Sequence, residues 1–277
     1  MIKINKNRIS PPESLLPPYK EMFPENSIPK TAKMTHQCRK ELIAKQAYTD
    51  TPRYNRRYKL LDIKNKLQQI YKSKCAYCEH RLEELHVEHY RPKSIYFWLA
   101  YSWDNLLLAC PTCNKRKGNH FQIRGPQIHF IETEQTLKDI NNLSTAYDRS
   151  EKPLLVNPEK RDPKDHIAFS KQGEIFSDQE EFIYTIETCG LNRPALIDDR
   201  RKILNDFQVK IVSILATYKN PEQQQLALQV LFRSFKIDSQ DEANEFIAFR
   251  KYCIIRGWLK KIVQQVRDTS STSYEQK

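Results

Sequence analysis

The chain has 277 residues, of which 39% are hydrophobic and 29% are charged, so it can bury a sizeable core as one large domain or two small ones. Glycine is scarce, with 5 residues, and this balance favours a helix-rich protein over a β-sandwich or a disordered chain. The excess of 46 basic over 34 acidic residues gives a net charge of +12, which favours a polyanionic partner such as nucleic acid.

Neither a membrane span nor a secretory signal is visible. No apolar run approaches the roughly 18 residues that a bilayer requires. The first 18 residues contain no apolar centre of the kind that a signal peptide needs. We therefore expect a cytoplasmic protein without a membrane partner.

The N-terminal part divides into two segments. Residues 1–33 contain six prolines, which disfavour regular helix and predict an extended, proline-rich arm. Residues 34–74 are predicted to be helical, because apolar residues recur at helical spacing in the stretches 36–48 and 53–72.

The C-terminal part is also predicted to be helical. Residues 125–177 read as a loop-rich connection, in which only the stretches 154–156 and 166–170 suggest short strands. The region 178–267 has the pattern of four helices, which we expect at 179–189, 194–218, 222–235 and 241–266. The polar tail 268–277 is expected to be disordered.

Two pairs of cysteines indicate a metal site. Cys75 and Cys78 form one C-x-x-C pair, and Cys110 and Cys113 form the second. Two such turns supply the four thiolates of a closed tetrahedral zinc site, which is structural because it has no open position. The remaining cysteines are expected to be small buried apolar side chains: Cys38, Cys189 and Cys253.

The 31 residues between the two pairs, 79–109, exceed the linker of a simple zinc ribbon, which is about 15–20 residues. This insert contains Glu88-His89 followed by Arg91-Pro92, and then Asn105-Leu106. The second cysteine pair is followed directly by Asn114 and, three residues later, by Lys117. The segment between the two cysteine pairs is therefore expected to form a structural unit of its own.

In the order and spacing of these motifs, residues 75–120 resemble the HNH nuclease family. The resemblance implies a ββα-metal fold, two antiparallel strands and a helix around one divalent ion, with zinc outside the active site. The predicted fold class is mainly α, with a small inserted, treble-clef-like module of this kind at 75–124.

The resemblance also implies a role for each matching residue. His89 matches the general base that takes a proton from water, which suits a side chain with a near-neutral pKa. Glu88 matches the acidic ligand of Mg²⁺ or Mn²⁺, since hard cations prefer oxygen. Asn105 matches the asparagine that braces the loop and the histidine. Asn114 matches the residue that completes the catalytic metal site.

Three points stay open at this stage. The family most often has Asp where this chain has Glu88, and the longer side chain leaves the exact position of the ion open. His120 is a rival to Asn114 for the last metal ligand. His86 shares a strand face with Glu88 by the two-residue period, and could be an outer ligand, a phosphate contact or a solvated histidine.

Basic and aromatic side chains surround these motifs. An interface with nucleic acid is predicted from five basic residues, which are expected to meet phosphates: Arg91, Lys93, Lys115, Arg116 and Lys117. An aromatic run suggests either hydrophobic core, the favoured interpretation, or a platform for stacked bases: Tyr96, Phe97, Trp98, Tyr101 and Trp103.

The layout is similar to a narrower group, the HNH nuclease subunits of Septu-type and retron-associated anti-phage systems. This second resemblance rests on the stretches 88–93, 103–106 and 155–158, and on Leu191-Asn192-Arg193 before an arginine-rich helix. It implies an endonuclease for DNA or RNA, tRNA included, that acts with an ATPase subunit. The alternative is a non-catalytic, zinc-stabilised module that binds nucleic acid or protein.

Overall fold

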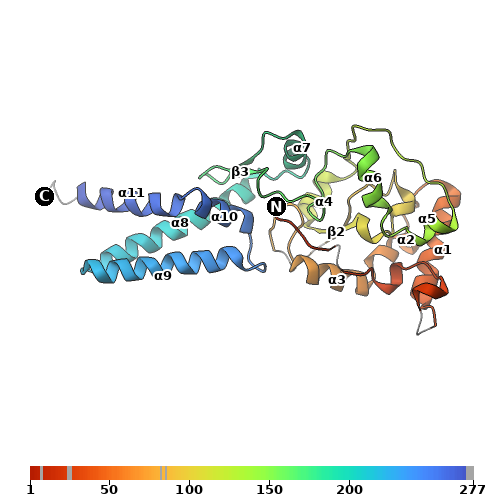
Figure 1. The fold of residues 1–277 in the computed structure, drawn as a ribbon, viewed down its shortest axis with the longest axis horizontal. Coiled ribbons are helices and arrows are strands. Elements are labelled where there is room, and N and C mark those ends of the chain that lie inside the picture. Colours follow the sequence, from red (N-terminus) through yellow and green to blue (C-terminus); the bar gives the residue numbers. More distant parts are fainter. Residues whose placement is uncertain (7–8, 24–26, 82, 85, 273–277) are drawn as a thin grey trace.

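The structure is a computed structural model, which describes residues 1–272 except 7–8, 24–26, 82 and 85. The molecule is elongated, with an arm of helices that projects from a body containing the short strands β1 and β2 (Figure 1). No helix in the described part of the chain has the length and apolarity to cross a membrane. The mainly helical fold class predicted from the sequence is confirmed.

The first 71 residues cover one side of the body. After two short 3₁₀ turns, Glu13–Leu15 and Lys20–Met22, they form α1 (Lys30–Lys45), α2 (Pro52–Asn55), the 3₁₀ turn Arg57–Lys59 and α3 (Leu61–Tyr71). The single helix expected over 53–72 is broken because Leu60 has an extended backbone, with φ −61° and ψ 151°. On the far side of this break, α3 buries Ile63, Leu67 and Tyr71.

The centre of the body is a small ββα unit. Strand β1 (His86–His89) pairs antiparallel with β2 (Leu106–Ala109), and His89 lies opposite Leu106. All four residues of β2 are buried, so the strand reads as a continuous apolar run rather than an alternating one. Helix α4 (Pro111–Lys117) follows directly and packs against β1.

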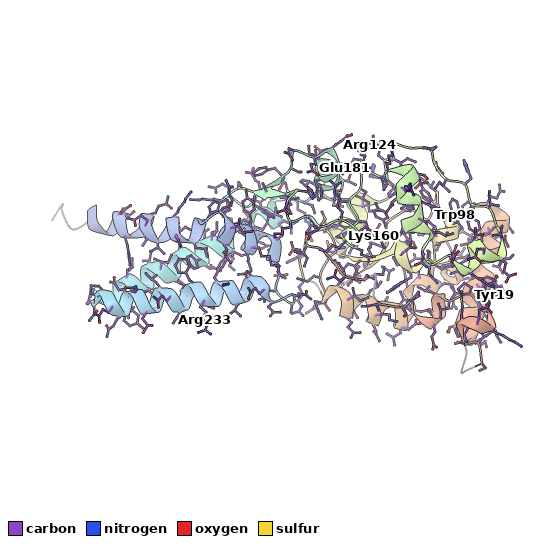
Figure 2. The ribbon with its side chains drawn as sticks, viewed as in Figure 1. Tyr19, Trp98, Arg124, Lys160, Glu181 and Arg233 are labelled. Carbon is purple, nitrogen blue, oxygen red and sulfur yellow. The ribbon has the colours of Figure 1, made fainter. Side chains whose placement is uncertain are left out.

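The aromatic run between the two strands belongs to the core. Tyr96, Trp98, Tyr101 and Trp103 are each less than 5% exposed, and Phe97 packs beside them. Figure 2 shows Trp98 within the body. The interpretation of this run as core, rather than as a stacking platform for bases, agrees with the structure.

A connecting region links the ββα unit to the arm. It contains α5 (Glu134–Lys138), α6 (Leu143–Glu151), the hairpin of β3 (Ala168–Phe169) and β4 (Ile175–Phe176), and α7 (Glu180–Thr188). Arg124 forms ion pairs with Glu180 and Glu181, which fasten the segment after α4 to the start of α7 (Figure 2). Residues 154–156, where a strand was suggested, lie in an irregular stretch.

The arm consists of α8 (Pro194–Thr217), α9 (Pro221–Gln240), α10 (Ile247–Ile255) and α11 (Trp258–Thr272) (Figure 1). The helix expected at 241–266 is two helices, because Gly257 takes a left-handed conformation with φ 65° that ends α10. Helix α11 continues into the tail that was expected to be disordered, and residues 273–277 of that tail lie outside the described residues.

Candidate active site

The four paired cysteines converge between the two strands and α4. Cys75, Cys78, Cys110 and Cys113 are buried, and their sulfurs all lie within 4.8 Å of one another. Four sulfurs at roughly 2.3 Å from one zinc ion would be separated by about 3.8 Å. The Sγ atoms of Cys78 and Cys110 are 3.9 Å apart, so the cluster has the geometry of a tetrahedral metal site.

Arg193, the residue immediately before α8, closes this cluster on one side. Its guanidinium lies 3.4 Å from the sulfur of Cys113, 3.6 Å from that of Cys78 and 3.7 Å from that of Cys110. A cation that donates to thiolates offsets part of the negative charge of a four-thiolate centre. In the sequence, Arg193 was noted only within the stretch Leu191-Asn192-Arg193 that precedes an arginine-rich helix, because no local pattern links it to cysteines 80 or more residues away.

A cavity of about 420 Å³ opens beside the cluster, along β1 and α4. Glu88 and His89 from the end of β1 line it, together with Asn114 from the first turns of α4. His86 also lines it, whereas His120 is absent from the residues that surround it. The structure therefore brings together the three side chains that the sequence proposed for one site, and it leaves the rival His120 outside.

His89 is held in one tautomer by the loop that follows β1. Its Nε2 lies 3.0 Å from the carbonyl oxygen of Ala100, which can only accept, so Nε2 carries the proton and Nδ1 keeps a free lone pair. The ring of Tyr58 packs against it edge-on, with centroids 4.5 Å apart. Burial lowers the pKa of His89 to about 3, so the imidazole is neutral at physiological pH and can accept a proton.

Asn105 fixes the loop that carries the Ala100 carbonyl. Its Oδ1 accepts from the backbone N–H of Arg91 at 2.8 Å. Its amide nitrogen donates to the carbonyl oxygens of Arg91 and Leu99, at 3.1 and 3.2 Å. The fully buried Asn105 thus ties both ends of the loop together, and it acts on His89 through the backbone rather than by direct contact.

Glu88 is buried and paired with a lysine. Its Oε1 lies 2.6 Å from Nζ of Lys117, which also donates to the carbonyl oxygen of His89 at 2.7 Å. Burial raises the pKa of Glu88, and the ammonium of Lys117 opposes this shift. The Glu88 carboxylate also accepts from the backbone N–H of His89, and it lines the cavity, where it can serve a cation.

Asn114 and His86 meet across the cavity. The amide nitrogen of Asn114 lies 3.3 Å from Nδ1 of His86, and Nε2 of His86 lies 3.0 Å from a carboxylate oxygen of Glu84. His86 therefore donates to Glu84 and accepts from Asn114, and no described residue forms a hydrogen bond with the amide oxygen of Asn114. One carboxylate oxygen and one amide oxygen, with water, form the kind of donor set that Mg²⁺ accepts.

Comparisons with known proteins agree with this geometry. The family described as HNH endonuclease matches residues 75–120, from the first cysteine pair to just beyond α4. Residues 75–120 are therefore similar to an HNH endonuclease domain, and this segment is called the HNH domain below. The boundaries of the match enclose the ββα unit, the cysteine cluster and the three cavity residues of the candidate active site.

Curated relatives lie among the Septu proteins. Septu protein PtuB of Bacillus mycoides (strain KBAB4) is 31% identical over 177 residues, which cover 57% of this chain and 56% of the relative. Septu protein PtuA of the same strain is 24% identical over 208 residues, covering 70% and 26%, respectively. Septu protein PtuB of Bacillus thuringiensis is 42% identical over 71 residues, covering 24% and 28%. The chain thus spans about half of the first relative and about a quarter of the others, and the resemblance to Septu proteins noted in the sequence is confirmed.

Two of the five residues expected to contact phosphates are buried and paired with carboxylates of the protein itself. Arg91 is fully buried, and its guanidinium pairs with Asp148 at 2.8 Å and with Glu151 at 2.9 Å, both from α6. Lys117 is also fully buried, in its pair with Glu88. Because each cation already has a desolvated partner, the placement of these two residues on a nucleic-acid surface does not agree with the structure.

The other three expected contacts remain accessible. Lys115 and Arg116 are exposed on α4, and Lys93 is half-buried on the wall of the cavity. Sequence reasoning overlooked two further cavity lysines, Lys59 and Lys64, because they precede the HNH domain and no motif singles them out.

Proposed function

We propose that the chain is a metal-dependent endonuclease that hydrolyses phosphodiester bonds of DNA or RNA, tRNA included. The observation that carries this proposal is that Glu88, His89 and Asn114 line one cavity beside the four-cysteine cluster. A water-activating base, oxygen ligands for a hard cation and a rigid support are the parts that metal-assisted phosphodiester hydrolysis requires.

In this proposal His89 removes a proton from the attacking water. The lone pair on Nδ1 accepts it, while Nε2 stays fixed to the carbonyl oxygen of Ala100. Asn105 keeps that carbonyl in place, so the base cannot turn away from the water.

Two metals fit the donor sets. The four thiolates would hold a structural zinc ion, and Glu88 with Asn114 would hold Mg²⁺ or Mn²⁺. When bound, the harder ion stabilises negative charge on the phosphate and on the leaving oxygen.

The Septu relatives suggest the setting. We infer that the chain is the nuclease effector of a cytoplasmic anti-phage defence complex, and that it works with an ATPase subunit, as the resemblance to Septu-type systems implies. Support comes from the similarity to proteins named Septu PtuB and PtuA.

A cleavage assay tests the function directly. Wild type is incubated with supercoiled plasmid and with tRNA, in Mg²⁺ or Mn²⁺, alone and then with the ATPase partner added. His89→Ala should lower the cleavage rate by roughly 10²–10⁴-fold, the usual contribution of a general base. His120→Ala is the matched control, because His120 lies outside the cavity, and it should cut at the wild-type rate.

The alternative function, a zinc-stabilised binding module without catalysis, makes the opposite prediction. It predicts that Glu88, His89 and Asn114 point apart and share no cavity, whereas the three residues line one. No cleavage by wild type with the ATPase present would favour that alternative, whereas cleavage by His89→Ala at the wild-type rate would refute the catalytic role of His89.

A further inference from the structure

The cavity of the HNH domain has a wall that the domain itself does not supply. Tyr58, Lys59 and Lys64 line it from the helical segment that precedes the first cysteine. On one continuous helix, Lys59 and Lys64 would point about 140° apart, because each residue turns the helix by roughly 100°. The break at Leu60 separates the 3₁₀ turn from α3 and lets both lysines face the same cavity.

Two of the cavity lysines, Lys59 from this wall and Lys93 from the HNH domain, lie close to the proposed base. The Nζ atoms of Lys59 and Lys93 are 5.5 and 5.9 Å from the centre of the Tyr58 ring. That ring is itself 4.5 Å from the ring of His89.

In the described part of the chain, no carboxylate forms a close ion pair with these cations. Neither Lys59, Lys64 nor Lys93 forms an ion pair within 4.0 Å in the described part of the chain. The carboxylates on the same cavity are already engaged, because Glu88 pairs with Lys117 and Glu84 with His86. Asp50 acts on Lys59 and Lys93 only through its charge, and it is exposed and bonded to Asn55.

We propose that Lys59 and Lys64 bind the phosphates that flank the scissile one, so that the nucleic-acid strand runs from the HNH domain over the break between the 3₁₀ turn and α3. This inference rests on the proposed function, because it takes a nucleic-acid strand as the ligand of the cavity. Uncompensated ammonium groups next to a catalytic cavity attract the polyanion and release its counterions.

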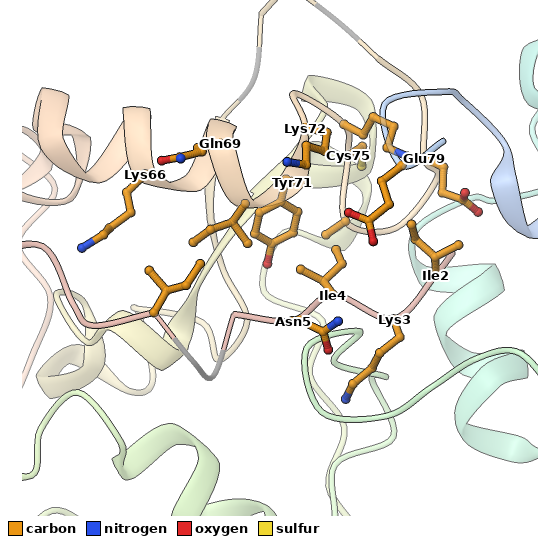
Figure 3. Close-up of a pocket in the computed structure, with 15 residues that line it drawn as sticks. Ile2, Lys3, Ile4, Asn5, Lys66, Gln69, Tyr71, Lys72, Cys75 and Glu79 are labelled. Carbon is orange, nitrogen blue, oxygen red and sulfur yellow. The ribbon is translucent and has the colours of Figure 1, made fainter. Parts of the chain in front are cut away.

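A second group of lysines provides a matched control. Lys66 and Lys72 line a separate cavity of about 360 Å³ between α3 and the N-terminal segment (Figure 3). Lys64 and Lys66 are two residues apart and therefore point to nearly opposite sides of α3. Lys66 already donates to the carbonyl oxygen of Ser10, and the second cavity includes the carboxylates of Glu79 and Glu242.

The test measures binding rather than cleavage. Fluorescence anisotropy follows three fluorescein-labelled probes: a 20-nucleotide DNA strand, its 20-base-pair duplex and an RNA hairpin. The protein is the full chain carrying His89→Ala, without added Mg²⁺, from about 50 to 300 mM NaCl, the range in which phosphate contacts lose affinity. Lys59→Gln with Lys64→Gln is compared with Lys66→Gln with Lys72→Gln in the same background.

Each phosphate contact contributes about 0.9 to the slope of log affinity against log salt for a duplex and about 0.7 for a single strand. The Lys59 and Lys64 pair of substitutions should therefore reduce the slope by about 1.8 or 1.4, respectively, and the control pair should leave it unchanged. Equal slopes for both pairs, or no binding of any probe at the lowest salt, would overturn the inference.

The outcome is separable from that of the nuclease proposal. If wild type fails to cleave any substrate but the lysine pair still sets the salt dependence of binding, the hydrolytic function fails and the binding wall stands. If wild type cleaves in a His89-dependent manner while the lysine pair changes nothing, the wall fails and the nuclease stands.

Discussion

The ion pair between Lys117 and Glu88 should be the most sensitive point of the candidate active site. The side chains are 0% and 5% exposed, and the Nζ–Oε1 distance is 2.6 Å. Removing one partner from such a pair leaves an uncompensated buried charge, which costs about 3–5 kcal/mol. Lys117→Met keeps the apolar stem but removes the charge, so we expect it to lower the free energy of unfolding by about that amount.

Urea unfolding with zinc in excess, followed by tryptophan fluorescence, measures this loss. Lys115→Met is the matched control, because Lys115 lies in the same helix but is exposed, and a surface substitution should change stability by no more than about 0.5 kcal/mol. Adding Glu88→Gln to Lys117→Met should cost less than the sum of the single changes, since no buried charge then lacks a partner. Equal losses for Lys117→Met and Lys115→Met would refute the importance of the pair.

Three further predictions concern His89 and the cysteine cluster. The pKa of His89 is about 3 rather than 6.5, so the native state binds fewer protons between these values and loses stability as the pH falls below 6.5. This loss amounts to about 2 kcal/mol between pH 6.5 and 5, and urea titrations of His89→Gln should lack it. Purified wild type should contain one zinc ion per chain by elemental analysis, and Cys110→Ser should lose it; zinc-free wild type would contradict the cluster assignment. Arg193→Met should weaken zinc retention against a chelator by roughly 10–100-fold, while Arg201→Met on the exposed face of α8 should not.

The HNH domain could be predicted from the sequence because the residues that define it lie close together along the chain. Two C-x-x-C pairs fix four ligands, and the order of Glu88, His89, Asn105 and Asn114 between and after them defines a strand, a loop and a helix. The helices outside the domain were also recognisable from their 3.6-residue periodicity, although the breaks at Leu60 and Gly257 were missed. Periodicity does not report a local break when apolar residues continue on both sides.

Burial of charge was not predictable in the same way. Arg91 and Lys117 stand in basic surroundings and read as surface cations, but their partners come from other elements of the fold. Glu151, which binds Arg91, lies 60 residues further along the chain. Conversely, Lys59 and Lys64 read as an ordinary solvated helix face, and only the tertiary structure places them on the cavity.

The position of Asn114 depends on contacts at both ends of α4, with the cysteine cluster at one end and with β1 at the other. Helix α4 has seven residues, far fewer than the roughly 12–15 that an isolated helix needs for stability in water. Its N-terminal end is fixed by the cluster, where the sulfur of Cys110 accepts from the backbone N–H of Cys113 at 3.3 Å. Its C-terminal end is fixed by Lys117, which reaches back to β1. Asn114 lies between these two attachments, so the cysteine cluster contributes to the candidate active site by holding Asn114 on the cavity that Glu88 also lines.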